Sequence, residues 1–340
     1  MAQVLYFMGP QQVAVAHEAL PSPAFGQVLV QSIVSAISPG TELLIYRGQV
    51  PTDLPKDETI PALAGNFAFP LRYGYAVVGR VRETGPGVAP DWEGRLVFAF
   101  QPHASHFLAT PEELLPLPED LPPEEAVFFA NMETAVTLLL DGRPLIGEQV
   151  AVFGQGIVGL LLTALLARFP LASLVTLDLY PKRRLASETL GAHASLDPMA
   201  PEAPAPWLAR LKGSRPYPGA DLTYEITGNP AALDQAIAAT GFNGRVVIGS
   251  WYGRKTAQLH LGGRFHRSRI LLISSQVSSL PPELSGRWIN MRRYETTWQM
   301  LQEIRPARLI TQRFPLTQAN QAYELLDKNP ADTIQVILTY

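Results

Sequence analysis

The stretch GQGIVG, residues 154–159, carries three glycines at the G-x-G-x-x-G spacing that is typical of nucleotide-binding loops. It directly follows the β-branched run QVAVF and opens the apolar run IVGLLLTALLARF, which is the strand–turn–helix context that such a loop requires. Gly154 permits the tight turn, Gly156 lets the backbone approach a pyrophosphate, and Gly159 lets the helix pack against the sheet. Free N–H groups at the start of the helix favour a phosphate. The pattern predicts a dinucleotide site formed by Gly154, Gly156, Ile157, Val158 and Gly159.

Asp178 lies at the end of the next β-branched run, 19 residues after Gly159 (178 − 159). At this position a carboxylate accepts hydrogen bonds from an adenosine ribose. The carboxylate also repels a 2′-phosphate, so the sequence favours NAD over NADP. Lys182, Arg183 and Arg184 follow closely, and they either offset this repulsion or form the solvated start of a helix.

Strand-like and helix-like runs alternate from residue 149 to about residue 275, and these elements must position the glycine loop. QVAVFG, LVTLDL, LTYEIT and GRVVIGS are strand-like, whereas RRLASETLG and PAALDQAIAAT are helix-like. Apolar strands that alternate with helices form a parallel sheet covered on both faces. The predicted fold class is therefore α/β, with a Rossmann-type, doubly wound parallel sheet.

Residues 1 to about 125 are β-rich instead. MAQVLYFMGPQQVAV predicts two strands around a Gly-Pro turn, and QVLVQSIVSAIS, YAVVGRVRET and GRLVFAF are further β-branched runs. A helical pattern begins near EEAVFFANMETAVTLLL. The tail from RFPL onward predicts strand, helix and strand, and we expect it to return to the N-terminal part. Since 340 residues are long for one core, two domains are expected.

The composition excludes several kinds of chemistry. The chain has no cysteine, so it forms no disulfide, thiolate nucleophile or thiolate-bound metal site. A net charge of −3 gives no reason to expect nucleic acid or an anionic membrane as a partner. The N-terminus lacks a signal-peptide pattern, and the longest apolar runs are too short to span a bilayer. A cytoplasmic protein with a small-molecule substrate is expected.

The order of these elements, with motifs such as SPGTELLIYRG, GYAVVGRV, GEQVAVFGQGIVG and YEITGNPAALDQAI, resembles the medium-chain dehydrogenase/reductase superfamily of the zinc alcohol dehydrogenase type. The resemblance covers nearly the whole chain. It implies a GroES-like catalytic domain formed by residues 1–125 and 300–340, with a Rossmann domain, residues 126–299, inserted between them. ISPGTE, FQPHASHF, NMETA and SSQVSSLPPELSGRW are similar to a branch usually labelled zinc-type dehydrogenases. The S-x-G-T-E element is also similar to that of the dehydrogenase acting on the hydroxyethyl side chain of bacteriochlorophyllide.

The sequence departs from this superfamily where a catalytic zinc would be held. Zinc members have a cysteine where this chain has Pro39 and a histidine where it has Tyr75, and their third ligand aligns near Ala130. The cysteine-rich loop of a structural zinc is absent too. Because a catalytic zinc needs three protein ligands, the resemblance implies a zinc-free member. His103 and His106 with a carboxylate form a weak metal pattern, and two loop histidines are more often solvated.

Without zinc, hydroxyl, imidazole or backbone N–H groups must stabilise the charge on the substrate oxygen. The resemblance implies that Thr41 corresponds to the residue whose hydroxyl contacts this oxygen in zinc members. It implies that Tyr75 replaces a zinc-binding histidine, so that its phenol points into the same cavity. It places Thr134 beside the nicotinamide, and His103 just beyond Phe100, whose position walls the substrate pocket. His103 is the candidate whose pKa suits proton exchange near neutrality. The candidate catalytic residues are Thr41, Tyr75 and His103, although Thr41 can equally stabilise its turn and Tyr75 can fill the volume vacated by zinc.

Charged residues near these candidates have structural interpretations as well. Glu42 and Arg47 are expected to form an ion pair. Glu133 either orients His103 or Tyr75 or acts as a carboxylate at a helix start. Three arginines lie close together in the sequence: Arg287, Arg292 and Arg293. They would suggest an acidic substrate if they faced a cleft. The preferred interpretation is that they form the exposed start of a helix.

The main prediction is a zinc-independent, NAD(P)-dependent oxidoreductase that transfers hydride between nicotinamide and an alcohol or carbonyl substrate. The alternatives are reduction of an activated C=C bond with NADPH and nucleotide binding without turnover.

The run RILLISSQV, residues 269–277, is apolar, rich in β-formers and expected at an edge of the Rossmann sheet. A bare edge of that composition favours a two-fold partner, so a homodimer is expected.

Overall fold

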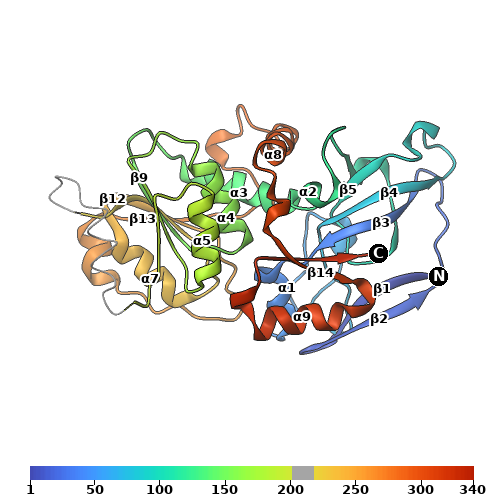
Figure 1. Cartoon of the computed structure of the whole chain (residues 1–340), viewed down its shortest axis with the longest axis horizontal. Coiled ribbons are helices and arrows are strands. Elements are labelled where there is room, and N and C mark those ends of the chain that lie inside the picture. Colours follow the sequence, from blue (N-terminus) through green and yellow to red (C-terminus); the bar gives the residue numbers. More distant parts are fainter. Residues whose placement is uncertain (201–217) are drawn as a thin grey trace. The chain divides into compact units, whose positions relative to one another are not determined.

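The structure is a computed structural model that describes residues 1–200 and 218–340 (Figure 1). The chain forms two compact units. One comprises Met1–Ala130 and Leu301–Tyr340, and the other comprises Asn131–Met300. One unit carries a parallel sheet and the other a separate β-rich sheet, so the predicted α/β fold class is confirmed. Among the described helices, none has the length and apolar character that crossing a bilayer demands.

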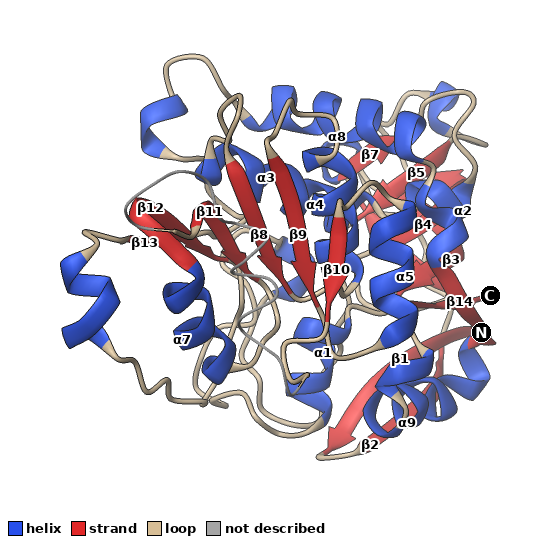
Figure 2. Ribbon diagram, turned by 60° about the vertical axis from the view of Figure 1, so that its left-hand side comes forward, coloured by secondary structure: helices blue, strands red, loops and turns tan. Residues whose placement is uncertain are grey.

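A six-stranded parallel sheet forms the frame of the unit Asn131–Met300, in the order β10-β9-β8-β11-β12-β13 (Figure 2). Its strands are β8 (Gln149–Phe153), β9 (Ser173–Leu177), β10 (Ala194–Leu196), β11 (Ala220–Glu225), β12 (Thr240–Ile248) and β13 (Leu271–Ser274). The central strands are almost continuously buried, as expected where helices cover both faces of a parallel sheet.

The helices of this unit connect and cover the strands. They are α4 (Ile157–Leu166), α5 (Pro181–Thr189) and α7 (Pro230–Ala239), together with most of α3 (Phe129–Gly142) and of α8 (Asn290–Ile304). α4 packs on β8 and β9, α5 packs on β9 and β10, and α7 packs on β8, β11 and β12. All strands run in the same direction, so their carboxyl ends lie along one edge of the sheet.

Two sheets form the other unit. β1 (Ala2–Gly9) and β2 (Gln12–Glu18) pair antiparallel, which confirms the two strands predicted at the N-terminus. A seven-stranded sheet has the order β14-β15-β3-β4-β5-β7, with β6 also pairing with β3. Its strands are β3 (Val28–Ala36), β4 (Val77–Thr84), β5 (Leu96–Ala99), β6 (His106–Ala109), β7 (Leu114–Pro116), β14 (Ile310–Pro315) and β15 (Gln335–Thr339). Because β15 pairs with β3, the tail of the chain returns to the N-terminal sheet.

An aromatic cluster joins two of the three helices of this unit to the first strand. The helices are α1 (Pro39–Tyr46), α2 (Pro123–Ala126) and α9 (Ala319–Lys328). The ring of Tyr323 stacks on Tyr46 with centroids 5.6 Å apart and meets Phe7 edge-on at 5.2 Å. All three side chains are buried. This packing holds α9 against α1 and orients the Tyr323 hydroxyl toward the first turn of α1, where it meets Glu42.

Candidate functional site

The glycine loop between β8 and α4 has the geometry that its sequence predicts. Gly154 has φ +95°, and a Cβ there would lie 2.8 Å from the carbonyl oxygen of Ile226. A Cβ on Gly159 would lie 2.1 Å from the carbonyl oxygen of Gly154. Neither position therefore accepts a side chain without moving the backbone. These two glycines let the strand turn sharply and let α4 approach the sheet.

Gly156 serves a different purpose, because a Cβ there would meet no atom within 4 Å. It is the residue before α4, whose first turn begins with Ile157 and Val158. The first N–H groups of a helix have no partner within the helix, and they carry partial positive charge. The open space beside Gly156 and these N–H groups fit a pyrophosphate.

Asp178 follows β9 directly and braces the loop. Its Oδ2 accepts a hydrogen bond from the backbone N–H of Gln155 at 2.7 Å, and its Oδ1 accepts one from Tyr180 N–H at 2.8 Å. Each carboxylate oxygen has a second lone pair, so Asp178 can still accept a ribose hydroxyl. The carboxylate thus lies at the glycine loop, as the spacing of the two motifs predicts.

The basic residues after Asp178 are not simply solvated. Arg184 donates to the backbone carbonyls of Asp178 and Leu179, both at 2.8 Å. Arg183 lies over the ring of Tyr180, 4.8 Å from its centroid, and burial lowers the pKa of its guanidinium. Lys182 is exposed. Arg183 and Arg184 are therefore anchored next to the carboxylate.

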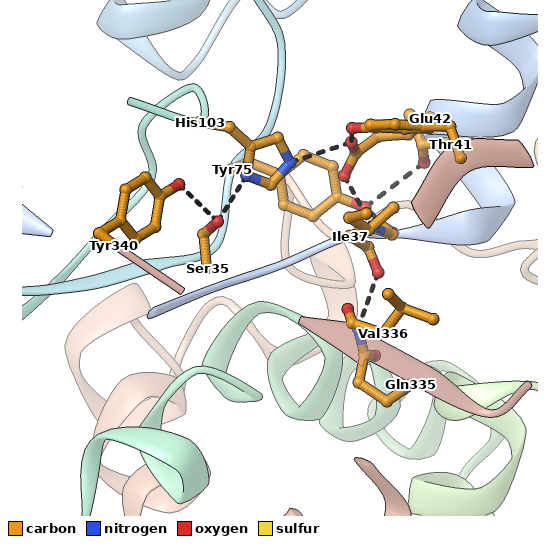
Figure 3. Close-up of polar contacts among 11 residues, drawn as sticks. Ser35, Ile37, Thr41, Glu42, Tyr75, His103, Gln335, Val336 and Tyr340 are labelled. Atoms are coloured by element: carbon orange, nitrogen blue, oxygen red, sulfur yellow. Dashed lines mark hydrogen bonds and ion pairs between the residues drawn. The ribbon is translucent and has the colours of Figure 1, made fainter. Parts of the chain in front are cut away.

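In the other unit, three hydroxyl groups converge at the start of α1 (Figure 3). Ser38 precedes the helix and Pro39 occupies its first position. The phenol of Tyr75 donates a short hydrogen bond to the Oγ of Ser38, and its oxygen lies 3.4 Å from the Oγ1 of Thr41. Burial raises the pKa of Tyr75, so the phenol stays protonated through the neutral range. The predicted candidates Thr41 and Tyr75 are therefore in contact.

His103 lies in a buried chain of hydrogen bonds beside this group (Figure 3). Its Nε2 is 3.0 Å from Oε2 of Glu42, and its Nδ1 is 2.7 Å from Oγ of Ser35. The Ser35 hydroxyl also lies 2.7 Å from the hydroxyl of Tyr340. His103, Glu42 and Ser35 have no exposed surface. Since both ring nitrogens of His103 have protein partners, a substrate would have to displace one of them to touch this ring.

The chain of donors ends on the carboxylate of Glu42. The Oε1 of Glu42 accepts the backbone N–H of Ser38 at 2.7 Å, and its Oε2 accepts the hydroxyl of Tyr323. Burial raises the pKa of Tyr323, which keeps this hydroxyl a donor. With His103 donating from Nε2, Glu42 accepts hydrogen bonds from His103, from the backbone N–H of Ser38 and from Tyr323. Its carboxyl group lies in the first turn of α1, where the positive end of the helix dipole favours an acceptor.

Gly74 shapes the space for the imidazole. It has φ +123°, and a Cβ there would lie 2.8 Å from Cδ2 of His103. The backbone carbonyl of Tyr73 accepts the N–H of His103 at 3.2 Å. A side chain at position 74 would therefore displace the ring that binds Glu42. Gly74 thus leaves room for His103, and the next residue, Tyr75, forms the three-hydroxyl group together with Ser38 and Thr41.

The expected ion pair between Glu42 and Arg47 is wrong. The Nε of Arg47 instead binds Oδ1 of Asp327 on α9 at 2.5 Å. Five residues correspond to about 500° of rotation along a helix, which leaves the two side chains about 140° apart. Glu42 therefore points into the core while Arg47 points toward α9.

Glu133 is not an exposed carboxylate at a helix start, because its side chain is buried. It lies on α3 and its Oε1 binds the guanidinium of Arg293 at 2.5 Å, with both side chains buried. Burial raises the pKa of Glu133 to about 7, although the charge and hydrogen bond of Arg293 act in the opposite direction. The preferred interpretation of an exposed basic helix start is correct for Arg287 and Arg292 and wrong for Arg293.

The other predicted positions are ordinary in their packing. Thr134 is half-buried on α3, one residue after Glu133. The ring of Phe100 packs edge-on against Phe98 and Phe129, with centroids 5.1 and 6.1 Å apart. His106 lies 3.1 Å from the Oγ of Ser105. Across residues 1–200 and 218–340, no group of three or more His, Asp or Glu side chains is arranged to hold a metal ion.

Sequence reasoning missed several residues of these clusters. Ser38 stands within the ISPGTE motif, so its position next to Thr41 was a usable signal. The partners of Glu42 and His103 come from distant segments that carry no local signature of pairing; they are Ser35, Tyr323 and Tyr340.

Comparisons with known proteins agree with this architecture. The chain is 29% identical over 248 residues to (R,R)-butanediol dehydrogenase of Bacillus subtilis (strain 168), which covers 65% of this chain and 69% of that protein. It is 26% identical over 352 residues to YphC, an uncharacterized zinc-type alcohol dehydrogenase-like protein of Escherichia coli (strain K12), with 94% of each chain covered. The solved structure of an alcohol dehydrogenase from E. coli CFT073, complexed with NADH, has a TM-score of 0.80 at 16% identity and covers 100% of this chain and 99% of that chain. No protein-family model matches the chain.

Proposed function

We propose that the chain is a zinc-independent member of the medium-chain dehydrogenase/reductase superfamily, as its similarity to known dehydrogenases supports, and that it transfers hydride between NAD(H) and an alcohol or carbonyl substrate. The observation that carries the proposal is the contact of Tyr75 with Ser38 and Thr41. The sequence resemblance assigns position 75 to a zinc-binding histidine of the zinc members. The substrate is a small molecule.

The glycine loop and Asp178 support the cofactor assignment. Gly156 leaves room for the pyrophosphate, and the start of α4 supplies N–H donors to it. Asp178 accepts from the adenosine ribose and repels a 2′-phosphate, which favours NAD over NADP. Arg183 and Arg184 lie beside the carboxylate, but the guanidinium of Arg184 is already engaged with backbone carbonyls. Bound nicotinamide supplies or accepts the hydride.

The residues at the zinc-ligand positions do not suit a metal. Pro39 and Ala130 have no donor atom in their side chains. Tyr75 is a neutral phenol whose hydroxyl is turned toward Ser38 and Thr41. Zinc in proteins is bound by thiolate, imidazole or carboxylate groups, and none of these occupies the three positions.

In place of a metal, the three-hydroxyl group handles the charge and proton of the substrate oxygen. Tyr75, protonated because its pKa is raised, donates a hydrogen bond to a carbonyl oxygen and so stabilises the negative charge that develops during reduction. Thr41 and Ser38 accept and donate on either side of the phenol, so they can pass on a proton when an alcohol is oxidised. Glu42 and His103 act indirectly: Glu42 holds the backbone N–H of Ser38, and His103 holds Glu42.

The test is a screen of NADH and NADPH oxidation against aldehydes, ketones and enones, and of NAD⁺ and NADP⁺ reduction with secondary alcohols and polyols. The screen is repeated with Tyr75→Phe and, as a matched control, Tyr73→Phe. Tyr73 is buried, and its ring packs edge-on against Tyr75 with centroids 6.0 Å apart. We expect Tyr75→Phe to lower kcat/KM by about 10²-fold or more, as for loss of one oxyanion donor. We expect Tyr73→Phe to stay within about threefold.

Two results contradict the proposal. NADPH-dependent reduction of enones without turnover of carbonyls or alcohols identifies a C=C reductase instead. Full activity in Tyr75→Phe removes the phenol from the mechanism, even if carbonyls are reduced.

A further inference from the structure

Arg293 is a fully enclosed cation in a place that does not favour one. It is 2% exposed and lies in the first turn of α8. A positive charge at a helix N-terminus is opposed by the helix dipole, and burying a charge is unfavourable until its partners compensate. The helix alone therefore gives no reason for an arginine at this position.

The guanidinium joins two separate segments of its unit. Its Nη2 binds Oε1 of Glu133 at 2.5 Å, and its Nη1 donates to the backbone carbonyl of Val277 at 2.6 Å and to Oγ1 of Thr137 at 3.2 Å. Glu133 and Thr137 are on α3, whereas Val277 belongs to the loop that follows β13. The planar fork of arginine makes these contacts at once, which a single ammonium group does less well. Arg293 thus ties the loop after β13 to α3.

Strand order shows where that loop lies relative to a dinucleotide. Asp178, the ribose acceptor, follows β9, and the glycine loop follows the next strand, β8. A dinucleotide with its adenosine at β9 and its pyrophosphate at β8 must continue away from β9, past the ends of β11 and β12 toward β13. These are three strand spacings of about 4.8 Å each.

Backbone hydrogen bonds run along the same edge of the sheet. Ile226, after β11, stands against Gly154, and Gly249 N–H donates to the carbonyl of Glu225 at 3.0 Å. Ser275 N–H donates to the carbonyl of Ile248 at 2.9 Å, which brings the start of the β13 loop to the end of β12. The loop that contains Val277 therefore begins at the carboxyl ends of β12 and β13, toward which the nicotinamide half of a dinucleotide would extend.

We propose that Arg293 is a positioning residue for the nicotinamide half of the cofactor, acting by holding the loop after β13 against α3. The proposal rests on the proposed function, because it requires a nicotinamide dinucleotide in this unit. Arg293 itself does not contact the cofactor. Its removal loosens the surface under the nicotinamide and leaves the adenosine and pyrophosphate contacts of Asp178 and the glycine loop intact.

The experiment compares the affinity of two probes, NADH and ADP-ribose, for the whole chain by titration calorimetry. ADP-ribose carries the adenosine, pyrophosphate and second ribose but lacks the nicotinamide ring. For Arg293→Met we expect the Kd of NADH to rise about tenfold or more while the Kd of ADP-ribose changes less than about twofold. Arg292→Met is the matched control, since Arg292 is the exposed neighbour on the same helix, and it should change neither.

A second variant keeps the test decisive. If Arg293→Met does not fold, Arg293→Lys keeps the charge but not the fork, and we expect it to raise the Kd of NADH severalfold with ADP-ribose unchanged. Equal losses for both probes, or no loss for either, overturn the proposal. If the unmodified chain binds neither NADH nor ADP-ribose, the proposed function itself fails.

Discussion

The carboxylate of Asp178 holds the glycine loop and, under the proposed function, also faces the adenosine ribose. It holds the backbone N–H of Gln155, which lies between Gly154 and Gly156. Under the proposed function its removal has three consequences: the loop loses one support, the adenosine ribose loses an acceptor, and the repulsion of a 2′-phosphate disappears. The first weakens NAD(H) and NADP(H) alike, whereas the second weakens NAD(H) and the third strengthens NADP(H).

Asp178→Ser should shift the preference from NAD(H) toward NADP(H). We expect the ratio of the Kd for NADPH to that for NADH to fall at least about tenfold, which corresponds to about 1.4 kcal/mol. Fluorescence titration of both cofactors measures this ratio. Asp234→Ser is the control, because Asp234 binds His260 and lies outside the loop, and it should leave the ratio unchanged. An unmodified chain that binds NADPH much more tightly than NADH would refute the role of Asp178.

Strand β13 has exposed apolar side chains that a second protein chain could cover. It forms one edge of the parallel sheet, as predicted for the run RILLISSQV, although the strand covers only Leu271–Ser274. Leu271 is 56% exposed and Leu272 36% exposed. An apolar edge with unpaired backbone groups is a template for pairing with another chain. We therefore propose that the protein is a homodimer in which this edge is covered.

Leu272→Lys should weaken that dimer, because it places a charge on the apolar edge. We expect the dissociation constant of the dimer to rise at least about tenfold, measured by sedimentation velocity across micromolar concentrations. Leu185→Lys serves as the control, since Leu185 is an exposed leucine on α5 and lies away from the edge. A monomeric mass for the unmodified chain at micromolar concentration would mean that β13 has some other cover.

At the scale of the whole molecule, the absence of cysteine and the side chains at positions 39, 75 and 130 predict a protein without bound zinc. Elemental analysis of protein purified without a metal-affinity tag should give well under one zinc per chain. Incubation with a chelator should leave the rate of hydride transfer unchanged. The prediction fails if a stoichiometric metal is found and its removal abolishes activity.

Local features of the sequence determined the glycine loop and most strands. A tight turn needs glycine at a positive φ, and a helix close to a sheet needs glycine at the contact. The structural roles of Gly154 and Gly159 could therefore be predicted from the spacing of the glycines. Buried parallel strands require continuous apolar runs, which made β8, β9, β11 and β12 recognisable. These requirements act between residues that are neighbours in the chain.

Only the tertiary structure decided the partners of the buried charges. Glu42 pairs with His103 and Tyr323 rather than with Arg47, and Glu133 pairs with Arg293. A buried charge must find its counterpart wherever the fold brings one, and these partners lie 61, 281 and 160 residues away (103 − 42, 323 − 42, 293 − 133). Residue types and local spacing do not indicate which residues pair across such sequence separations. For that reason the predicted catalytic groups could be named from the sequence, but the buried network behind them could not.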